Sequence, residues 1–188
     1  MQHGSKLIMW NLLSLDGFFE GRKSWELDWH PYIWGDELER FSLEQLRTAD
    51  RLVFGRVTYE GMAAYWQSAT GEIADFMNHL PKVVFSRTLE RADWANTRLA
   101  KGDLVGEIQD LKRQGDGNMY VFGSANLSAS LMERGLFDEY RLGLAPVLLG
   151  RGKALFGPSS SLQKLKILEA RPLSNGAVIL RYEPRRSE

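Results

Sequence analysis

The chain of 188 residues carries 24 lysines and arginines against 24 aspartates and glutamates, and it contains no cysteine. Zero net charge argues against a dedicated nucleic-acid binder, and the missing cysteines exclude disulfides and cysteine-ligated metal centres. No run of about 18 apolar residues and no apolar leader occurs, so no membrane span or signal peptide is predicted and a cytoplasmic location is expected.

The N-terminal third predicts a buried strand, a long loop and a helix. Residues 6–14 are nearly all apolar, which is typical of a strand covered on both faces. Residues 15–35 form a loop rich in glycine and tryptophan, and loops of this length are often functional. Asp36 and Glu39 have the spacing of a capping box, so Asp36 is predicted to cap the start of a helix.

The middle of the chain alternates between strand and helix patterns, which favours a parallel α/β sheet. The end differs, because Ser174-Asn175-Gly176 separates two strand-like runs and Asn-Gly is a strong hairpin signal. We therefore expect a mostly parallel sheet that ends in an antiparallel hairpin. The predicted organisation is a single domain over 6–184, an N-terminal extension or cloning remnant over 1–5, and a polar tail over 185–188.

Two glycine turns carry most of the functional information. Gly55 follows the apolar run 52–54, and Gly123 follows the run 119–122. At a strand–glycine–helix junction the backbone can approach a ligand, and the free N–H groups of the helix favour an anion. Two such turns predict a ligand with several phosphates, such as a dinucleotide. Ordinary turns with Thr58 or Ser124 as a helix cap would explain the same residues.

A third turn, Ser86-Arg87-Thr88, also follows an apolar run. One arginine between two hydroxyls suits a terminal phosphate through charge-assisted hydrogen bonds. Beside a dinucleotide it would read a ribose 2′-phosphate, which favours the phosphorylated cofactor. Taken alone, it could equally be a polar surface turn.

The long loop places carboxylates beside aromatic side chains. Asp16, Glu20, Glu26 and Asp28 alternate with phenylalanines and tryptophans. Such a loop could stack on a flat heterocycle, with a carboxyl group acting as a proton donor; the aromatic residues could instead fill the core or an interface. No G-x-G-x-x-G occurs, so a Rossmann fold is not supported, and the three histidines lack ligand spacing, so no metal site is predicted.

Taken together, the motifs resemble dihydrofolate-reductase-like proteins over residues 6–183. The nearer resemblance is to the C-terminal reductase domain of bifunctional riboflavin-biosynthesis deaminase-reductases and to its stand-alone bacterial relatives. The segments that carry it are Ser14-Leu15-Asp16-Gly17, Gly55-Arg56-x-Thr58-x-Glu60, Val83-Val84-Phe85-Ser86, Val121-Phe122-Gly123-Ser124-Ala125 and Leu148-Leu149-Gly150-x-Gly152-x-x-Leu155-Phe156.

This resemblance implies an α/β three-layer sandwich, NADPH as cofactor and a homodimer. The residues it assigns to cofactor binding are Gly17, Gly55, Arg56, Thr58, Ser86, Arg87, Gly123, Ser124 and Ala125. It puts Asp16 beside the nicotinamide. The family's proton-donating carboxylate cannot be aligned uniquely; Asp28, Asp36 and Glu37 are all candidates, and Asp16 and Asp28 are the catalytic residues predicted here.

The predicted function is an NADPH-dependent reductase that acts on a small pterin-like or ribosylamino-pyrimidine substrate, similar to 5-amino-6-(5-phosphoribosylamino)uracil reductase. The deaminase half is absent, so the bifunctional enzyme is excluded. Dihydrofolate reductase, a non-catalytic nucleotide-binding dimer and an interaction protein that uses the tryptophan-rich loop are the alternatives. No nucleic-acid or membrane partner is expected.

Overall fold

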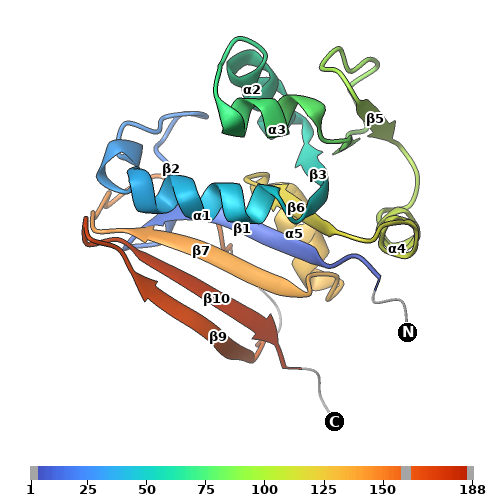
Figure 1. Cartoon of the computed structure of the whole chain (residues 1–188). Coiled ribbons are helices and arrows are strands. Elements are labelled where there is room, and N and C mark those ends of the chain that lie inside the picture. Colours follow the sequence, from blue (N-terminus) through green and yellow to red (C-terminus); the bar gives the residue numbers. More distant parts are fainter. Residues whose placement is uncertain (1–3, 158–161, 186–188) are drawn as a thin grey trace.

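The computed structural model describes residues 4–157 and 162–185, and its centre is an eight-stranded sheet (Figure 1). The strand order is β5-β4-β3-β6-β1-β7-β10-β9; β5 to β7 along this row are mutually parallel, and β10 is antiparallel to both of its neighbours. The parallel sheet with an antiparallel C-terminal hairpin is therefore confirmed. The strands are β1 Leu7–Ser14, β3 Ala49–Gly55, β4 Lys82–Phe85, β5 Thr97–Ala100, β6 Asn118–Phe122, β7 Glu139–Ala145, β9 Leu165–Pro172 and β10 Val178–Pro184.

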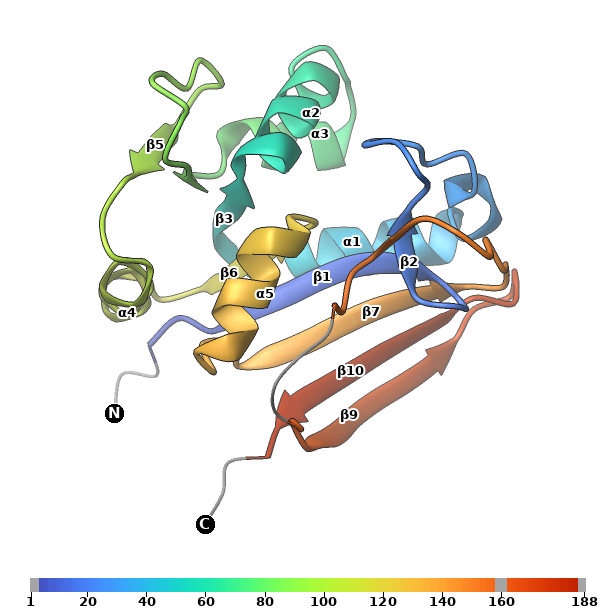
Figure 2. The same ribbon diagram turned by 180° about the vertical axis from the view of Figure 1, so that it is seen from behind.

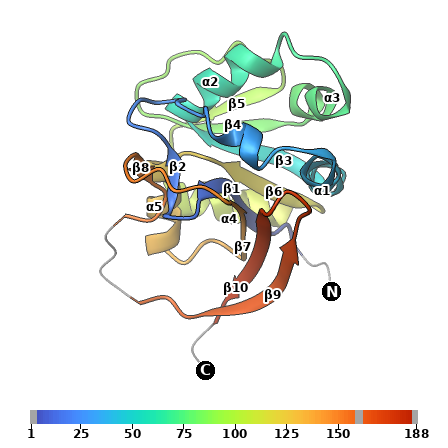
Figure 3. The ribbon, with the colours of Figure 1, turned by 90° about the vertical axis from the view of Figure 1, so that its left-hand side faces the viewer.

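Helices cover both faces of this sheet. On one face lie α1 (Asp36–Leu46), α2 (Arg56–Trp66) and α3 (Glu72–His79), whose buried side chains share a core cluster with Ile8 and Trp10. On the other face lie α4 (Leu104–Gln114) and α5 (Ala125–Glu133), which pack with Leu7 and Met9. Figure 2 shows the face with α5, and Figure 3 shows α1 and α3 on the opposite side of the sheet from α5. Alternate residues of β1 thus enter two cores, which explains its continuous apolar run.

The C-terminal hairpin is fastened to the start of α1. Gly176 adopts φ +87°, a conformation that glycine tolerates. In the same turn the backbone N–H of Ser174 donates to Glu37 at 2.7 Å, and the amide of Asn175 donates to the carbonyl of Ile33 at 2.9 Å. The turn between the last two strands therefore also holds the segment that enters α1.

Three local predictions are corrected. Gly35, with extended backbone and no side-chain cap, precedes α1, so Asp36 is the first helical residue rather than the cap. Helix α2 begins at Arg56, and Thr58 does not cap it. The long loop contains a short strand, β2 (Phe18–Glu20), which pairs with β8 (Lys153–Ala154), and a 3₁₀ turn over His30–Tyr32. A pair of such short strands so far apart in the chain has no local sequence signal.

The described N-terminal end of the chain is packed against the domain. Ser5, assigned above to the extension, is buried, and its hydroxyl donates to Asp50 at 2.9 Å. Residues 1–3 and 186–188 lie outside the described residues. Within the described ranges, no helix has the length and apolar character needed to cross a bilayer.

Candidate functional site

A cavity of about 1270 Å³ opens above the carboxyl ends of β3, β4, β5 and β6. Ligands commonly bind at this edge of a parallel sheet. The cavity has two parts. We name one part the phosphate side because it holds the turns predicted to bind phosphates; it is formed by the turns after these four strands, at residues 55–58, 86–88, 100–102 and 123–127. The other part, the aromatic side, is formed by β1, β6, β8, α1, the long loop, α2 and α3. Its lining residues include Trp10, Phe19, Glu20, Trp25, His30, Trp34, Gln45, Tyr65, Trp66, Phe122 and Lys153.

The phosphate side brings the three predicted turns together. Eight of the nine residues predicted to bind the cofactor line this side of the cavity, and Gly17 is the exception. The eight are Gly55, Arg56, Thr58, Ser86, Arg87, Gly123, Ser124 and Ala125. Gly17 lies outside the lining, in the turn after β1, with φ +88°. The convergence of the turns follows from the parallel pairing of β4 with β3 and of β3 with β6.

The two glycine turns are tied to each other by reciprocal hydrogen bonds. The N–H of Gly55 donates to the Ser124 hydroxyl at 2.8 Å, and the N–H of Ser124 donates to the Thr58 hydroxyl at 2.9 Å. The N–H of Gly123 donates to the side-chain oxygen of Asn11 at 2.9 Å. A Cβ on Gly123 would lie 3.1 Å from the Thr58 hydroxyl, and φ is +53° there, so both the tight contact and the backbone conformation favour glycine. Thr58 and Ser124 are thus cross-links rather than helix caps.

This arrangement leaves the first turns of two helices open to the cavity. Neither α2 nor α5 has a side-chain cap, and Arg56, Val57, Ala125 and Asn126 of their first turns line the phosphate side. Uncapped helix N-termini present N–H donors and a positive dipole end to an anion. Two of them at one cavity fit a pyrophosphate, while the charge of Arg56 itself is paired with Glu60 at 2.9 Å.

A second cation lies next to Arg87. In the parallel register of β4 and β5, Phe85 pairs with Ala100, so the turns that start at Ser86 and Lys101 are neighbours. Arg87 and Lys101 are exposed and line the cavity, and among the described residues neither has an ion-pair partner. The Ser86 hydroxyl accepts the N–H groups of Thr88 and Leu89 and so shapes the turn. Lys101 could not be selected from the sequence, because its position beside Arg87 depends on the register of β4 and β5.

The two predicted catalytic aspartates do not line the cavity. Asp16 is exposed, and its carboxylate accepts hydrogen bonds from the Ser14 hydroxyl at 2.7 Å and from the backbone of Leu149 and Gly150. The Ser14 hydrogen bond, with help from these N–H groups, lowers the pKa of Asp16, which suits a fixed anion that joins two loops rather than an acid. Asp28 is exposed between the lining residues Leu27 and His30. The structure therefore does not support the proton-donor role for either residue.

Two ionisable residues that were not selected do lie on the aromatic side. Glu20 is buried and forms an ion pair with Lys153 at 3.2 Å, and it also accepts the N–H of Trp25 at 2.9 Å. His30 lies edge-on to Trp29, and burial lowers its pKa to about 4, so its imidazole is neutral near pH 7. Glu20 was visible in the aromatic loop, but its pairing with Lys153 depends on the β2–β8 contact.

Trp25 connects the long loop to α2. It has φ +67°, and its ring packs so closely on Gly61 that a Cβ there would lie 1.9 Å from a ring atom. The backbone N–H of Trp25 is held by Glu20. Since Trp25 lines the cavity, this contact encloses the aromatic side between the loop and α2.

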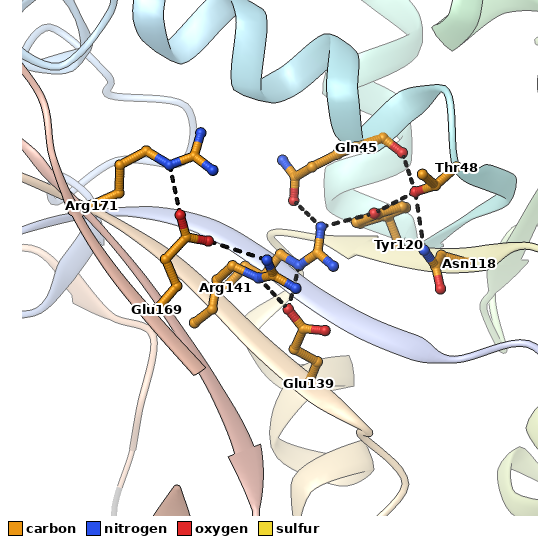
Figure 4. Close-up of polar contacts among 9 residues, drawn as sticks. Gln45, Thr48, Asn118, Tyr120, Glu139, Arg141, Glu169 and Arg171 are labelled. Atoms are coloured by element: carbon orange, nitrogen blue, oxygen red, sulfur yellow. Dashed lines mark hydrogen bonds and ion pairs between the residues drawn. The ribbon is translucent and has the colours of Figure 1, made fainter. Parts of the chain in front are cut away.

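A buried polar network lies beneath the aromatic side of the cavity (Figure 4). Arg141 donates to Glu139 at 2.6 Å, to the side-chain oxygen of Gln45 at 3.2 Å and to the Tyr120 hydroxyl at 3.0 Å. Arg181 also donates to Glu139, at 2.7 Å. Gln45 and Tyr120 line the cavity, whereas the charged members of the network do not. The network thus keeps its charged groups out of the cavity lining and fixes the side chains of Gln45 and Tyr120, which belong to it.

The lowered pKa of His30 predicts that the protein loses stability at pH values well above those at which carboxylates are protonated. The unfolded chain binds a proton at His30 near pH 6.5 and the folded protein only near pH 4, so protonation favours unfolding between these values. Urea unfolding at pH 5 should give a free energy roughly 2 kcal/mol below that at pH 7.5. His30→Gln should remove most of this difference, and His79→Gln, a change at an exposed site, should leave it. Equal pH profiles for the wild type and His30→Gln would contradict the assignment.

Comparisons with known proteins agree with this geometry. The family model of the RibD C-terminal domain matches residues 5–179. The uncharacterized protein YyaP of Bacillus subtilis is 30% identical over 183 residues, which is 94% of each chain. A crystal structure from Shewanella sp. PV-4 superposes with a TM-score of 0.83 at 23% identity over 96% of this chain and 99% of that one. Dihydrofolate reductase from Enterococcus faecalis, complexed with NADP(H), gives 0.64 at 13% identity over 96% and 97%.

Proposed function

Because the chain belongs to the RibD C-terminal domain family, we propose that it is an NADPH-dependent reductase of a planar heterocycle, either pterin-like or a ribosylamino-pyrimidine. Its fold is dihydrofolate-reductase-like. The observation that carries the proposal is the phosphate side of the cavity, where two helix N-termini without a side-chain cap lie beside Arg87 and Lys101, which have no ion-pair partner within the described part of the chain.

The residues of the phosphate side fit the cofactor in two places. The first turns of α2 and α5 would hold the pyrophosphate through backbone N–H groups, and Gly123 keeps the space between them free of side chain. Arg87 and Lys101 would hold the ribose 2′-phosphate. When bound, NADPH supplies a hydride. The protein positions the reacting groups and excludes water, and the Trp25–Gly61 contact contributes to that exclusion.

Dihydrofolate reduction is the less favoured activity. Asp36 and Glu37, the carboxylates at the start of α1, do not line the cavity, and Glu37 binds the Ser174 turn. Among the described lining residues Glu20 is the sole carboxylate, and it is paired with Lys153. The neutral side chains of His30 and Gln45 are among the polar groups that the aromatic side offers to a substrate.

The test is a comparison of nucleotide binding with turnover. Calorimetry should show NADPH binding more tightly than NADH, and a panel of pterins and ribosylamino-pyrimidines should contain a compound that accelerates loss of the nicotinamide absorbance. NADPH binding without any oxidation would favour the alternative of a non-catalytic nucleotide-binding protein. An absence of all nucleotide binding would contradict the proposal.

The protein is further proposed to form a homodimer through β9. This strand is at the edge of the sheet and exposes Leu165, Ile167 and Leu168 by 38%, 52% and 41%. Exposed apolar side chains on an unpaired edge favour association. Light scattering should give twice the monomer mass for the wild type and for Leu148→Lys, a control at a separate exposed leucine, and the monomer mass for Ile167→Lys. A wild-type monomer would overturn this part of the proposal.

A further inference from the structure

The aromatic side of the cavity is built for a flat, uncharged surface. Its walls include Trp10, Trp25, Trp34, Tyr65 and Phe122, from the long loop, α2 and two strands. Trp25, Trp34 and Tyr65 remain exposed by 38%, 47% and 62%. Large aromatic rings that stay exposed around a cavity offer stacking area to a planar ligand.

The same side offers no site for a phosphate. Among its described residues the charged side chains are Glu20 and Lys153, and they neutralise each other at 3.2 Å. Glu20 is held in place by the N–H of Trp25, so a phosphate that reached Lys153 would meet a fixed carboxylate. His30 is neutral near pH 7 because it is buried. An anion without a cationic partner is costly to bury.

Gln45 provides a donor that points away from the charged network. Its side-chain oxygen accepts from Arg141, so the opposite assignment of the amide would set two N–H donors against each other. Its Nε2 therefore stays on the other side of the amide (Figure 4), and it has no hydrogen-bond partner among the described residues. Gln45 is 4% exposed and lines the cavity, so this nitrogen is suited to a ligand acceptor.

We infer that the aromatic side selects an uncharged planar ring that carries a carbonyl acceptor for Gln45, and that it discriminates against ring compounds bearing a phosphate. This inference rests on the proposed function and narrows it, because it favours an unphosphorylated ring over a phosphoribosylamino-pyrimidine. The cofactor's phosphates and the substrate thereby occupy parts of the cavity with opposite electrostatic character.

A series of three compounds with one ring system tests the discrimination. Lumichrome has the planar tricyclic ring with its carbonyls in the alloxazine form, riboflavin has the isoalloxazine form of that ring with a ribityl chain on a nitrogen of the central ring, and riboflavin 5′-phosphate differs from riboflavin only by the phosphate. Their dissociation constants are measured by quenching of tryptophan fluorescence with NADP⁺ at saturation, which keeps the phosphate side filled. Riboflavin should bind at least tenfold more tightly than its phosphate. Equal or tighter binding of the phosphate, or no binding by any of the three, would overturn the inference.

A pair of variants on α1 tests the role of Gln45. Gln45→Glu keeps an oxygen for Arg141 but replaces the amide donor by a second acceptor, so lumichrome should bind at least tenfold more weakly. Ser42→Ala is the matched control, since Ser42 lines the same part of the cavity but its hydroxyl donates to the Leu38 carbonyl at 2.8 Å; its effect should stay below twofold. Unchanged lumichrome binding by Gln45→Glu would refute the assignment.

A final set of titrations separates this inference from the proposed function. The three flavin compounds are also titrated without nucleotide into Arg87→Ala/Lys101→Ala, in which the phosphate side lacks its free cations. If NADP⁺ fails to bind to the wild type while the variant keeps the preference for riboflavin, the reductase proposal fails and the ring site stands. If NADP⁺ binds to the wild type and the preference is absent in both proteins, the ring inference fails and the reductase proposal stands.

Discussion

Replacing Arg87 and Lys101 together by alanine is expected to weaken NADPH binding roughly a hundredfold and to leave NADH binding within about threefold. A hydrogen bond to a charged group contributes about 1.5–3 kcal/mol, and both side chains are exposed, so the lower end applies to each. Calorimetry with both nucleotides measures the difference, and each single variant should show about tenfold.

Arg98→Ala is the control for that experiment. Arg98 lies on β5 close to Lys101 in sequence, but it pairs with Glu107 at 2.8 Å and does not line the cavity. The control should leave both affinities unchanged. Equal losses of NADPH and NADH affinity in the double variant would show that these side chains do not distinguish the 2′-phosphate.

The second large effect is expected on stability, at Glu139. This carboxylate is 2% exposed and accepts hydrogen bonds from Arg141 and Arg181 through one oxygen. Glu139→Leu leaves two guanidinium groups without their buried partner, and breaking a buried pair in this way costs about 3–5 kcal/mol. Urea unfolding at pH 7 measures the loss. Glu169→Leu, in which the side chain removed is 25% exposed, should cost less than half as much.

The same carboxylate predicts a response to acid. Burial would raise the pKa of Glu139, but the hydrogen bonds and charges of Arg141 and Arg181 outweigh it, and the pKa is lowered. The stabilisation is therefore complete above the unfolded pKa of about 4.5 and is lost as the pH falls further. Glu139→Leu should show a flatter stability profile below pH 4.5. A profile parallel to that of the wild type would contradict this.

Most residues of the phosphate side could be predicted because they lie in short turns with a local sequence pattern. A glycine after an apolar run identifies the end of a strand. The turns that begin at Gly55 and Gly123 are in contact at the edge of the parallel sheet, through Gly55 and Ser124. The alternative role of Thr58 and Ser124 as helix caps was wrong, since each hydroxyl binds the other turn rather than its own helix. A cap and a cross-link have the same local sequence pattern.

The aromatic side could not be predicted to the same depth, because its polar groups are defined by contacts between distant residues. Gln45 is oriented by Arg141, and Glu20 is neutralised by Lys153. The acidic residues that looked most suitable in the sequence serve other purposes. Asp16 joins two loops, and Glu37 holds a hairpin turn.

That hairpin turn has a consequence for how selectivity could change in this protein. Asn175 holds Ile33, and Ser174 holds Glu37. These two anchored residues lie on either side of Trp34 in the chain, and Trp34 lines the cavity. The turn at Ser174 and Asn175 thus helps to position a wall of the cavity, although neither residue lines it. Variation in this distant bend is a route by which the protein could acquire new ligand preferences on the aromatic side while the phosphate side stays unchanged.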